Sequence, residues 1–191
     1  LHGEEGSREW TPFLDLLAQH FHVYAPAHPG QGGSQGLQHL DDLWDLIVFY
    51  EELIQALGIG RAYAIGHSYG GMLAAELAPF NPDLVSQLVL INSLGLWLNE
   101  APIADFFILN AEERAETLWF DSECDAAKAA FAQPSDPEEK MESDLARTET
   151  LAAVGKFVWP IPDRGLTKRI HRITMPKLLI WGDSDGMVPM N

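Results

Sequence analysis

The chain has 191 residues, 47% of them hydrophobic, with 28 acidic against 12 basic residues and a formal net charge of −16. A chain of this length can bury one core of ordinary size, so we expect one domain with a possible insertion. The charge argues against nucleic acid as a partner, because phosphate binding needs clustered lysine and arginine. It also argues against an anionic membrane surface.

The cysteine content and the hydropathy of the chain bear on its cellular location and on membrane insertion. Cys124 is the single cysteine, so no internal disulfide can form. A single cysteine fits a reducing compartment, so we expect a cytoplasmic location. No apolar run approaches the length of a membrane span, so we expect no membrane insertion. The sequence opens at Leu1 without an initiator methionine, and we expect the chain to be truncated at both ends.

The first third of the chain begins with an amphipathic pattern. Apolar residues recur every three or four positions between residues 10 and 21, which predicts a helix with Ser7 as a candidate N-cap. Residues 23–25 are a short apolar run, predicted as a buried strand. The prolines and glycines of residues 26–36 then predict a loop.

From residue 43 to residue 91, predicted helices alternate with short apolar runs that we predict as strands. A long amphipathic helix is predicted at 43–57, and a helix of small apolar residues at 69–78. Buried strands are predicted at 62–65, 88–91 and 177–181. Apolar strands without alternation, separated by helices, are typical of a parallel sheet covered on both faces, so we predict an α/β fold.

The region 95–170 does not continue this alternation of predicted helices and strands. Its composition is helical, and residues 99–150 hold 14 acidic and 4 basic residues. We therefore predict three parts: residues 1–94 as the first part of the core, 95–170 as a helical cap, and 171–191 as the return to the core with an acid-bearing turn.

The strongest chemical signal is the run Gly66-His67-Ser68-Tyr69-Gly70. A strand leads into it and a helix follows, which is the setting in which Gly-x-Ser-x-Gly forms a sharp turn that exposes the serine oxygen. The two glycines let strand and helix approach closely. We predict Ser68 as a nucleophile, with the following helix directing its N-terminal N–H groups at developing negative charge.

A second signal lies at the start of the chain, in Leu1-His2-Gly3-Glu4. Stabilising an oxyanion needs two backbone N–H donors. We predict Tyr69, next to the nucleophile, as one donor and Glu4 as the other.

A third signal follows the last predicted strand, where two acids stand in a turn. A carboxylate there can orient a catalytic histidine. We predict Asp185 for this role, with Asp183 as its rival; either acid alternatively does no more than stabilise the turn.

Together these motifs resemble the α/β-hydrolase superfamily, in the large group with a helical cap. The matches are His2-Gly3, the Pro-Gly-Gln-Gly-Gly-Ser run at 29–34, the elbow at 66–70, and Gly182-x-x-Asp185 followed by Val188-Pro189. The resemblance implies a triad in the order serine, acid, histidine, with no metal or organic cofactor. A serine at position 68 differs from relatives that use aspartate there.

The resemblance places the catalytic histidine after one more strand, beyond Asn191. None of the seven histidines occupies that position, so we expect these residues alone to be inactive. The predicted pocket residues from core and cap are His28, His67, Trp97, Phe106 and Trp159.

The predicted activity is a serine hydrolase acting on an ester or related carbonyl of a small molecule. The alternatives are a carbon–carbon bond hydrolase, an acyltransferase or a haloperoxidase of the same superfamily, and a non-catalytic binding protein with this fold. The sequence leaves the oligomeric state open.

Overall fold

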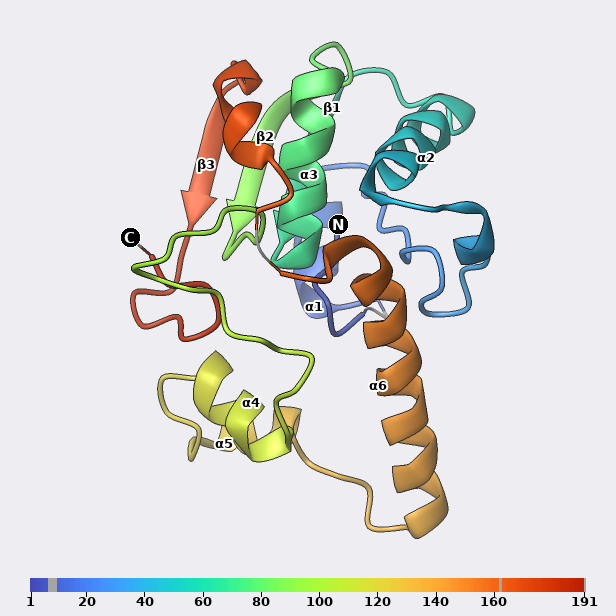
Figure 1. Cartoon of the computed structure of the whole chain (residues 1–191). Helices are drawn as coiled ribbons and strands as arrows, with labels where there is room; N and C mark the ends of the chain where they lie inside the picture. The colour runs from blue at the N-terminus through green and yellow to red at the C-terminus, as the bar shows by residue number, and fades with distance from the viewer. Residues whose placement is uncertain (7–9, 162, 191) are drawn as a thin grey trace.

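A parallel three-stranded sheet lies at the upper left of the molecule in Figure 1. The computed structural model describes residues 1–6, 10–161 and 163–190. The strands are β1 (Ala62–His67), β2 (Val85–Ile91) and β3 (Lys177–Ile180), in the spatial order β1-β2-β3. Both pairings are parallel, so the predicted α/β class is confirmed.

Helix α3 (Tyr69–Phe80) packs against the sheet and is buried from its first residue to Pro79. Its glycines and alanines allow this close approach, because small side chains keep the helix near the strands. The helix continues through Pro79, where we predicted it to close. Helix α2 (Leu43–Ala56) packs beside α3 through a buried stripe, and the Asp42 carboxylate caps its first turn.

Residues 23–25 do not form the predicted strand. No described segment pairs with them, and a strand is stabilised only when a neighbour takes up its backbone hydrogen bonds. Helix α1 (Pro12–Ala18) is shorter than predicted and is capped by Thr11. The predicted cap residue, Ser7, lies outside the described residues.

The chain between β2 and β3 is helical, as its composition predicts. It contains α4 (Ala111–Leu118), α5 (Asp125–Ala130) and α6 (Pro137–Val158), followed by two short 3₁₀ turns, Leu166–Lys168 and Ile170–Arg172. Another 3₁₀ turn, Leu37–His39, precedes α2. The division into core and cap stays a prediction.

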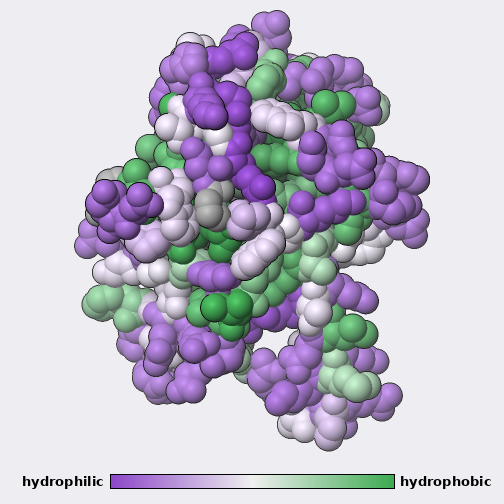
Figure 2. Space-filling view, in the orientation of Figure 1, coloured by the Kyte–Doolittle hydropathy of each residue, from purple (hydrophilic) through white to green (hydrophobic). Residues whose placement is uncertain are grey.

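Helices α4 to α6 lie beyond the carboxyl ends of the strands (Figure 1). The later half of α6 is buried, while its beginning is exposed and projects away. Figure 2 shows a notch between the α4–α5 part and the α6 part, both mostly hydrophilic at their outer ends. In the described part of the chain, no helix has the length and apolar character needed to cross a membrane.

A buried ion pair joins α3 to the segment that returns to the sheet. Glu76 is fully buried, and Arg169 donates to it from Nε at 2.8 Å and from Nη2 at 2.6 Å. The guanidinium also lies 4.6 Å from the ring centre of Trp44. The pair therefore fixes the return to β3 against two helices of the core.

Candidate active site

Ser68 stands at the tight turn between β1 and α3. Its backbone has φ 49° and ψ −116°, a conformation that non-glycine residues seldom adopt. The turn is held by the Ser68 N–H donating to Ile91 O (2.9 Å) and by Leu94 N–H donating to Ser68 O (3.1 Å). The Ser68 hydroxyl is buried, and no described side chain forms a hydrogen bond with it.

The glycines around Ser68 are required by close backbone contacts. A Cβ on Gly66 would lie 2.3 Å from Gly70 O, and a Cβ on Gly70 would lie 2.3 Å from Leu1 O and 2.4 Å from His2 O. Real Cβ atoms do not approach backbone oxygens so closely. The two glycines thus allow β1, α3 and the start of the chain to meet at the serine.

The first residues of the chain form a turn directly beside Ser68. Leu1 lies along β1, since its amino group donates to Ile65 O (2.6 Å) and its carbonyl accepts from His67 N–H (3.1 Å). Next in the chain, a Cβ on Gly3 would be 3.4 Å from the Ser68 Cβ. We call residues 3–6 the N-terminal turn; it is closed by Gly6 N–H donating to Gly3 O (3.2 Å).

Both predicted oxyanion donors flank this position. Tyr69 is the first residue of α3, so its N–H has no acceptor within the helix. Glu4 is buried in the N-terminal turn. Among residues 1–6, 10–161 and 163–190, neither of these two N–H groups has a hydrogen-bond acceptor.

Of the two predicted acids, Asp185 and Asp183, it is Asp185 whose carboxylate accepts hydrogen bonds from other described residues. Its Oδ1 accepts from Met187 N–H (2.8 Å) and Val188 N–H (2.9 Å), and its Oδ2 accepts from the Asn92 side chain. Asp183 is exposed, and no hydrogen bond to its carboxylate joins it to another described residue. The geometry therefore favours Asp185 as the oriented carboxylate.

Asn92 is a residue that the sequence analysis missed. It follows β2 with φ 44°, donates to Asp185, and accepts from Gly182 N–H (3.2 Å). Its neighbour Ile91 accepts from the Ser68 N–H. The end of β2 therefore holds both the serine turn and the acid turn. An asparagine just after a buried strand was the available signal, because asparagine tolerates positive φ.

His28 is buried in a hydrogen-bond network rather than exposed to a pocket. It is 1% exposed, its Nδ1 pairs with the Tyr50 hydroxyl, and its Nε2 lies 2.9 Å from His2 O. In return, the backbone N–H of His28 donates to Nε2 of His2 at 3.2 Å. A carbonyl only accepts, so Nε2 carries the proton and Nδ1 accepts from Tyr50.

Burial lowers the pKa of His28 to about 3, with the nearby His2 contributing in the same direction. Burial likewise raises the pKa of Tyr50. His28 is therefore a neutral side chain: its Nε2 donates to the backbone just before the N-terminal turn, and its Nδ1 accepts from the Tyr50 hydroxyl.

The other predicted pocket residues are scattered. Phe106 is 1% exposed and belongs to the core, whereas Trp159 is 52% exposed. Trp97 is half-buried and donates to Asn99, and His67 is exposed at the end of β1 beside Gly3. The role of these side chains and of His28 as pocket residues stays a prediction.

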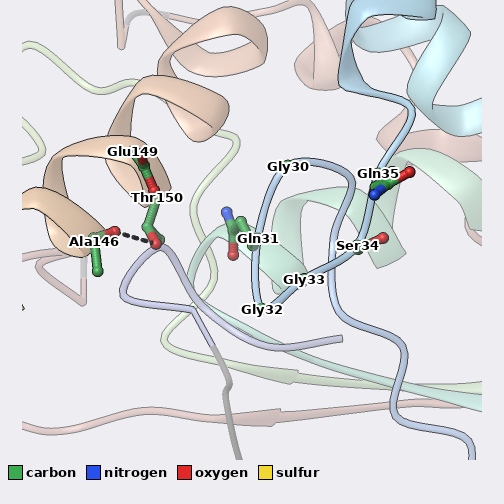
Figure 3. A pocket seen from close by; sticks show the side chains of 9 residues that line it. All are labelled: Gly30, Gln31, Gly32, Gly33, Ser34, Gln35, Ala146, Glu149 and Thr150. Atoms are coloured by element: carbon green, nitrogen blue, oxygen red, sulfur yellow. Dashed lines mark hydrogen bonds between the residues drawn. The ribbon is translucent and has the colours of Figure 1, made fainter.

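A hollow of about 590 Å³ lies elsewhere, between the loop after residue 29 and α6 (Figure 3). Loop residues 30–35 form one wall, and Ala146, Glu149 and Thr150 form the other. Thr150 uses its hydroxyl to donate to Ala146 O (2.8 Å). Neither Ser68 nor any predicted pocket residue lines this hollow.

In residues 1–6, 10–161 and 163–190, no three or more His, Cys, Asp or Glu side chains are placed to hold a metal ion.

Comparison with known proteins identifies the relatives of this chain. The sequence profile of the alpha/beta hydrolase fold family matches residues 1–139. Two relatives bear the name "Putative carbamate hydrolase RutD". The protein from Pantoea ananatis is 26% identical over 94% of this chain and 67% of its own length. The protein from Stutzerimonas stutzeri is 30% identical over 94% of this chain and 70% of its own length.

A solved structure has the same fold. It is the crystal structure of the serine hydrolase CCSP0084 from Cycloclasticus zankles, with a TM-score of 0.68 and 19% identity. The match covers 100% of this chain and 73% of that protein.

Proposed function

The chain belongs to the alpha/beta hydrolase fold family, and from that premise we propose that it comes from a serine hydrolase acting on an ester or a related carbonyl compound. Ser68 is the proposed nucleophile and Asp185 the proposed acid. The geometry of Ser68 carries the proposal: a buried hydroxyl on a positive-φ turn, at the start of α3 and beside Gly3.

The proposed reaction begins with proton transfer from Ser68 Oγ to a histidine. Oγ then forms a bond to the substrate carbonyl carbon, and the carbonyl oxygen becomes an oxyanion. The N–H groups of Glu4 and Tyr69 stabilise this oxyanion, and donors of this kind are each worth about 3 kcal/mol in comparable sites.

When the tetrahedral intermediate collapses, the histidine proton goes to the leaving group and an acyl-serine remains. Water, deprotonated by the same histidine, then attacks the acyl carbon and restores the Ser68 hydroxyl. Every bond change in this cycle involves serine, histidine, substrate and water, so it requires no metal or organic cofactor.

Asp185 is proposed to orient that histidine. Its three hydrogen bonds fix the carboxylate at the carboxyl end of the sheet, near the turn that carries Ser68. No described histidine forms a hydrogen bond with Ser68 Oγ or with Asp185. The proposed base is therefore a histidine outside residues 1–191, which span about two thirds of the two RutD relatives.

The substrate class follows from the same chemistry. A carbamate, the substrate class in the name of the two relatives, is attacked at its carbonyl as an ester is. The helices between β2 and β3 are proposed as a cap that covers the site, and a cytoplasmic location stays a prediction.

The direct test labels the full-length protein with a fluorophosphonate, which forms a bond to an activated serine. We expect labelling of the parent protein and none of Ser68→Ala. A matched control is Ser184→Ala, which removes an exposed serine next to Asp185 and should still be labelled. Asp185→Asn should label at least about tenfold more slowly, because the histidine loses its orienting carboxylate.

Different outcomes separate the alternatives. Folded full-length protein that resists labelling would contradict the nucleophile assignment and favour a non-catalytic binding protein. Labelled protein that turns over no ester or carbamate would point instead to carbon–carbon bond hydrolysis, acyl transfer or haloperoxidase activity.

A further inference from the structure

Two residues with positive φ stand at the ends of neighbouring strands. Ser68 follows β1 with φ 49°, and Asn92 follows β2 with φ 44°; in the described part of the chain they are the two non-glycine residues of this kind. The strands end in register, since His67 pairs with Ile91. Backbone strain persists only where surrounding contacts hold it, and it is concentrated at functional sites. The proposed role of Ser68 accounts for one of the two residues, and the contacts of Asn92 point to a role for the other.

The side chain of Asn92 uses both of its amide atoms on the turn that carries Asp185. Its Oδ1 accepts from Gly182 N–H at 3.2 Å. A backbone N–H only donates, so this contact fixes the amide orientation and leaves Nδ2 to donate to Asp185 Oδ2. An aspartate at position 92 would accept from Gly182 equally well, but it would place a second carboxylate against Asp185. Asparagine therefore suits both partners.

The backbone around Asn92 holds the serine turn and the strand that leads to the acid. The Asn92 N–H donates to Ile180 O at 3.0 Å, at the end of β3. On either side of Asn92, Ile91 O accepts from Ser68 N–H (2.9 Å) and Leu94 N–H donates to Ser68 O (3.1 Å). One short segment thus contacts the proposed nucleophile and the element that carries the proposed acid.

The oxygen of Asp185 that Asn92 contacts is the one left for a histidine. Oδ1 already accepts from two backbone N–H groups, those of Met187 and Val188, at 2.8 and 2.9 Å. In the described part of the chain, Oδ2 accepts from Asn92 alone. A carboxylate oxygen has a second lone pair, and Asp185 is half-buried, so a histidine N–H can still reach Oδ2. Without Asn92, no described group would fix the direction of that oxygen.

We propose that Asn92 is a positioning residue of the hydrolase, whose amide directs Asp185 Oδ2 at the catalytic histidine while the neighbouring backbone holds Ser68. This inference rests on the proposed hydrolase function and adds a residue outside the triad. Asn92 acts through Asp185 and contacts no substrate in the proposed reaction. Its loss should therefore slow the chemical steps and leave substrate binding unchanged, so that kcat falls and KM does not.

The kinetic test measures kcat and KM of the full-length protein on 4-nitrophenyl acetate. Asn92→Gly removes the amide and keeps the backbone, because glycine adopts positive φ without strain. We expect kcat to fall at least about tenfold and KM to stay within about threefold, the pattern of a misplaced catalytic group. Gln87→Ala removes an exposed amide from β2 and should change neither constant. Thermal unfolding of each variant shows that it is folded.

A second variant separates the donated hydrogen bond from the shape of the side chain. Asn92→Asp keeps nearly the same shape, tolerates positive φ and can still accept from Gly182 N–H. An ionised aspartate cannot donate to Asp185, so this variant should lose at least as much kcat as Asn92→Gly. An Asn92→Asp protein with the kcat of the parent would overturn the proposal, because the donated bond would then have no effect on the reaction.

A double-variant cycle shows whether Asn92 acts through Asp185. The measured quantity is the rate of fluorophosphonate labelling of Ser68. Adding Asn92→Gly to Asp185→Asn protein should change this rate by less than about twofold, because the carboxylate that Asn92 directs is already absent. A general loss of packing would instead lower the rate by the same factor in both backgrounds. Equal factors would overturn the proposal.

A structural readout separates this proposal from the hydrolase function. In crystals of the full-length protein, the Asp185 carboxylate should keep its contact with Asn92 in the parent and turn to another orientation in Asn92→Gly. If it does so and the parent neither reacts with fluorophosphonate nor cleaves the ester, Asn92 still orients Asp185 and the hydrolase proposal fails. If the parent cleaves the ester and Asn92→Gly keeps its kcat, the hydrolase proposal stands and the role of Asn92 fails.

Discussion

His28 makes a specific prediction about acid stability. In the folded protein its pKa is lowered from 6.5 to about 3, so it stays neutral while an unfolded chain takes up a proton. Below pH 6.5 the unfolded state therefore binds more protons at this position, and stability falls as the pH falls toward about 3. Between pH 8 and pH 5 this one group removes about 2 kcal/mol from the free energy of unfolding.

The change that isolates this effect is His28→Gln. Glutamine does not titrate, and its amide can still donate to His2 O, but the contact with Tyr50 is weakened. At pH 8 we expect the variant to be less stable than the parent by about 1–3 kcal/mol, the cost of an impaired buried hydrogen bond. At pH 5 this difference should shrink by about 2 kcal/mol, because only the parent loses the stability linked to His28.

The assay is urea unfolding followed by circular dichroism at both pH values, on the parent and His28→Gln proteins. His2 also has a lowered pKa, mainly through burial, but it is present in both proteins, so the comparison centres on position 28. His20→Gln, which removes an exposed histidine, serves as the control and should follow the parent. A difference between parent and His28→Gln that is the same at pH 8 and pH 5 would refute the assignment of His28 as a buried neutral side chain.

Two further predictions concern the core. Gly70→Ala should destabilise the fold by about 3 kcal/mol or more, because its Cβ would meet Leu1 O at 2.3 Å. Gly60→Ala, which has open space around it, should leave the free energy of unfolding nearly unchanged or raise it. Arg169→Met should cost about 3–5 kcal/mol by leaving the buried Glu76 unpaired, whereas adding Glu76→Leu should recover much of that loss. Chemical unfolding of the four variants checks both, and a double variant no more stable than Arg169→Met would contradict the second.

The sequence predicts those parts of the fold and site that depend on residues close together in the chain. The turn at Ser68 is an example, because the flanking glycines and the strand-to-helix order are all visible within a few residues, and the structure has the predicted strand, turn and helix there. The helical character of 95–170 is another, since composition alone indicates it. The strand at 23–25 was wrongly predicted because an apolar run shows neither that the segment is buried nor that a neighbour is present to pair with it; Tyr24 is 47% exposed.

What the sequence could not show are contacts between distant residues. His28 lies in a proline- and glycine-rich loop, which suggested an open position, yet its ring is enclosed by Tyr50, Tyr69 and His2. The aromatic residues chosen for a pocket were apolar enough for that role, but hydrophobicity does not distinguish a core residue such as Phe106 from an exposed one such as Trp159.

The first six residues connect these separate features. His2 is held from one side by His28, Gly3 lies beside Ser68, and Glu5 binds Arg114 of α4. A displacement of the N-terminal turn would therefore move Glu4, the proposed oxyanion donor, relative to Ser68. Because the ring of His28 bonds the backbone just before this turn, loss of that hydrogen bond should lower kcat on a neutral ester in the full-length protein. An unchanged kcat in a folded His28 variant would contradict the positioning role of His28.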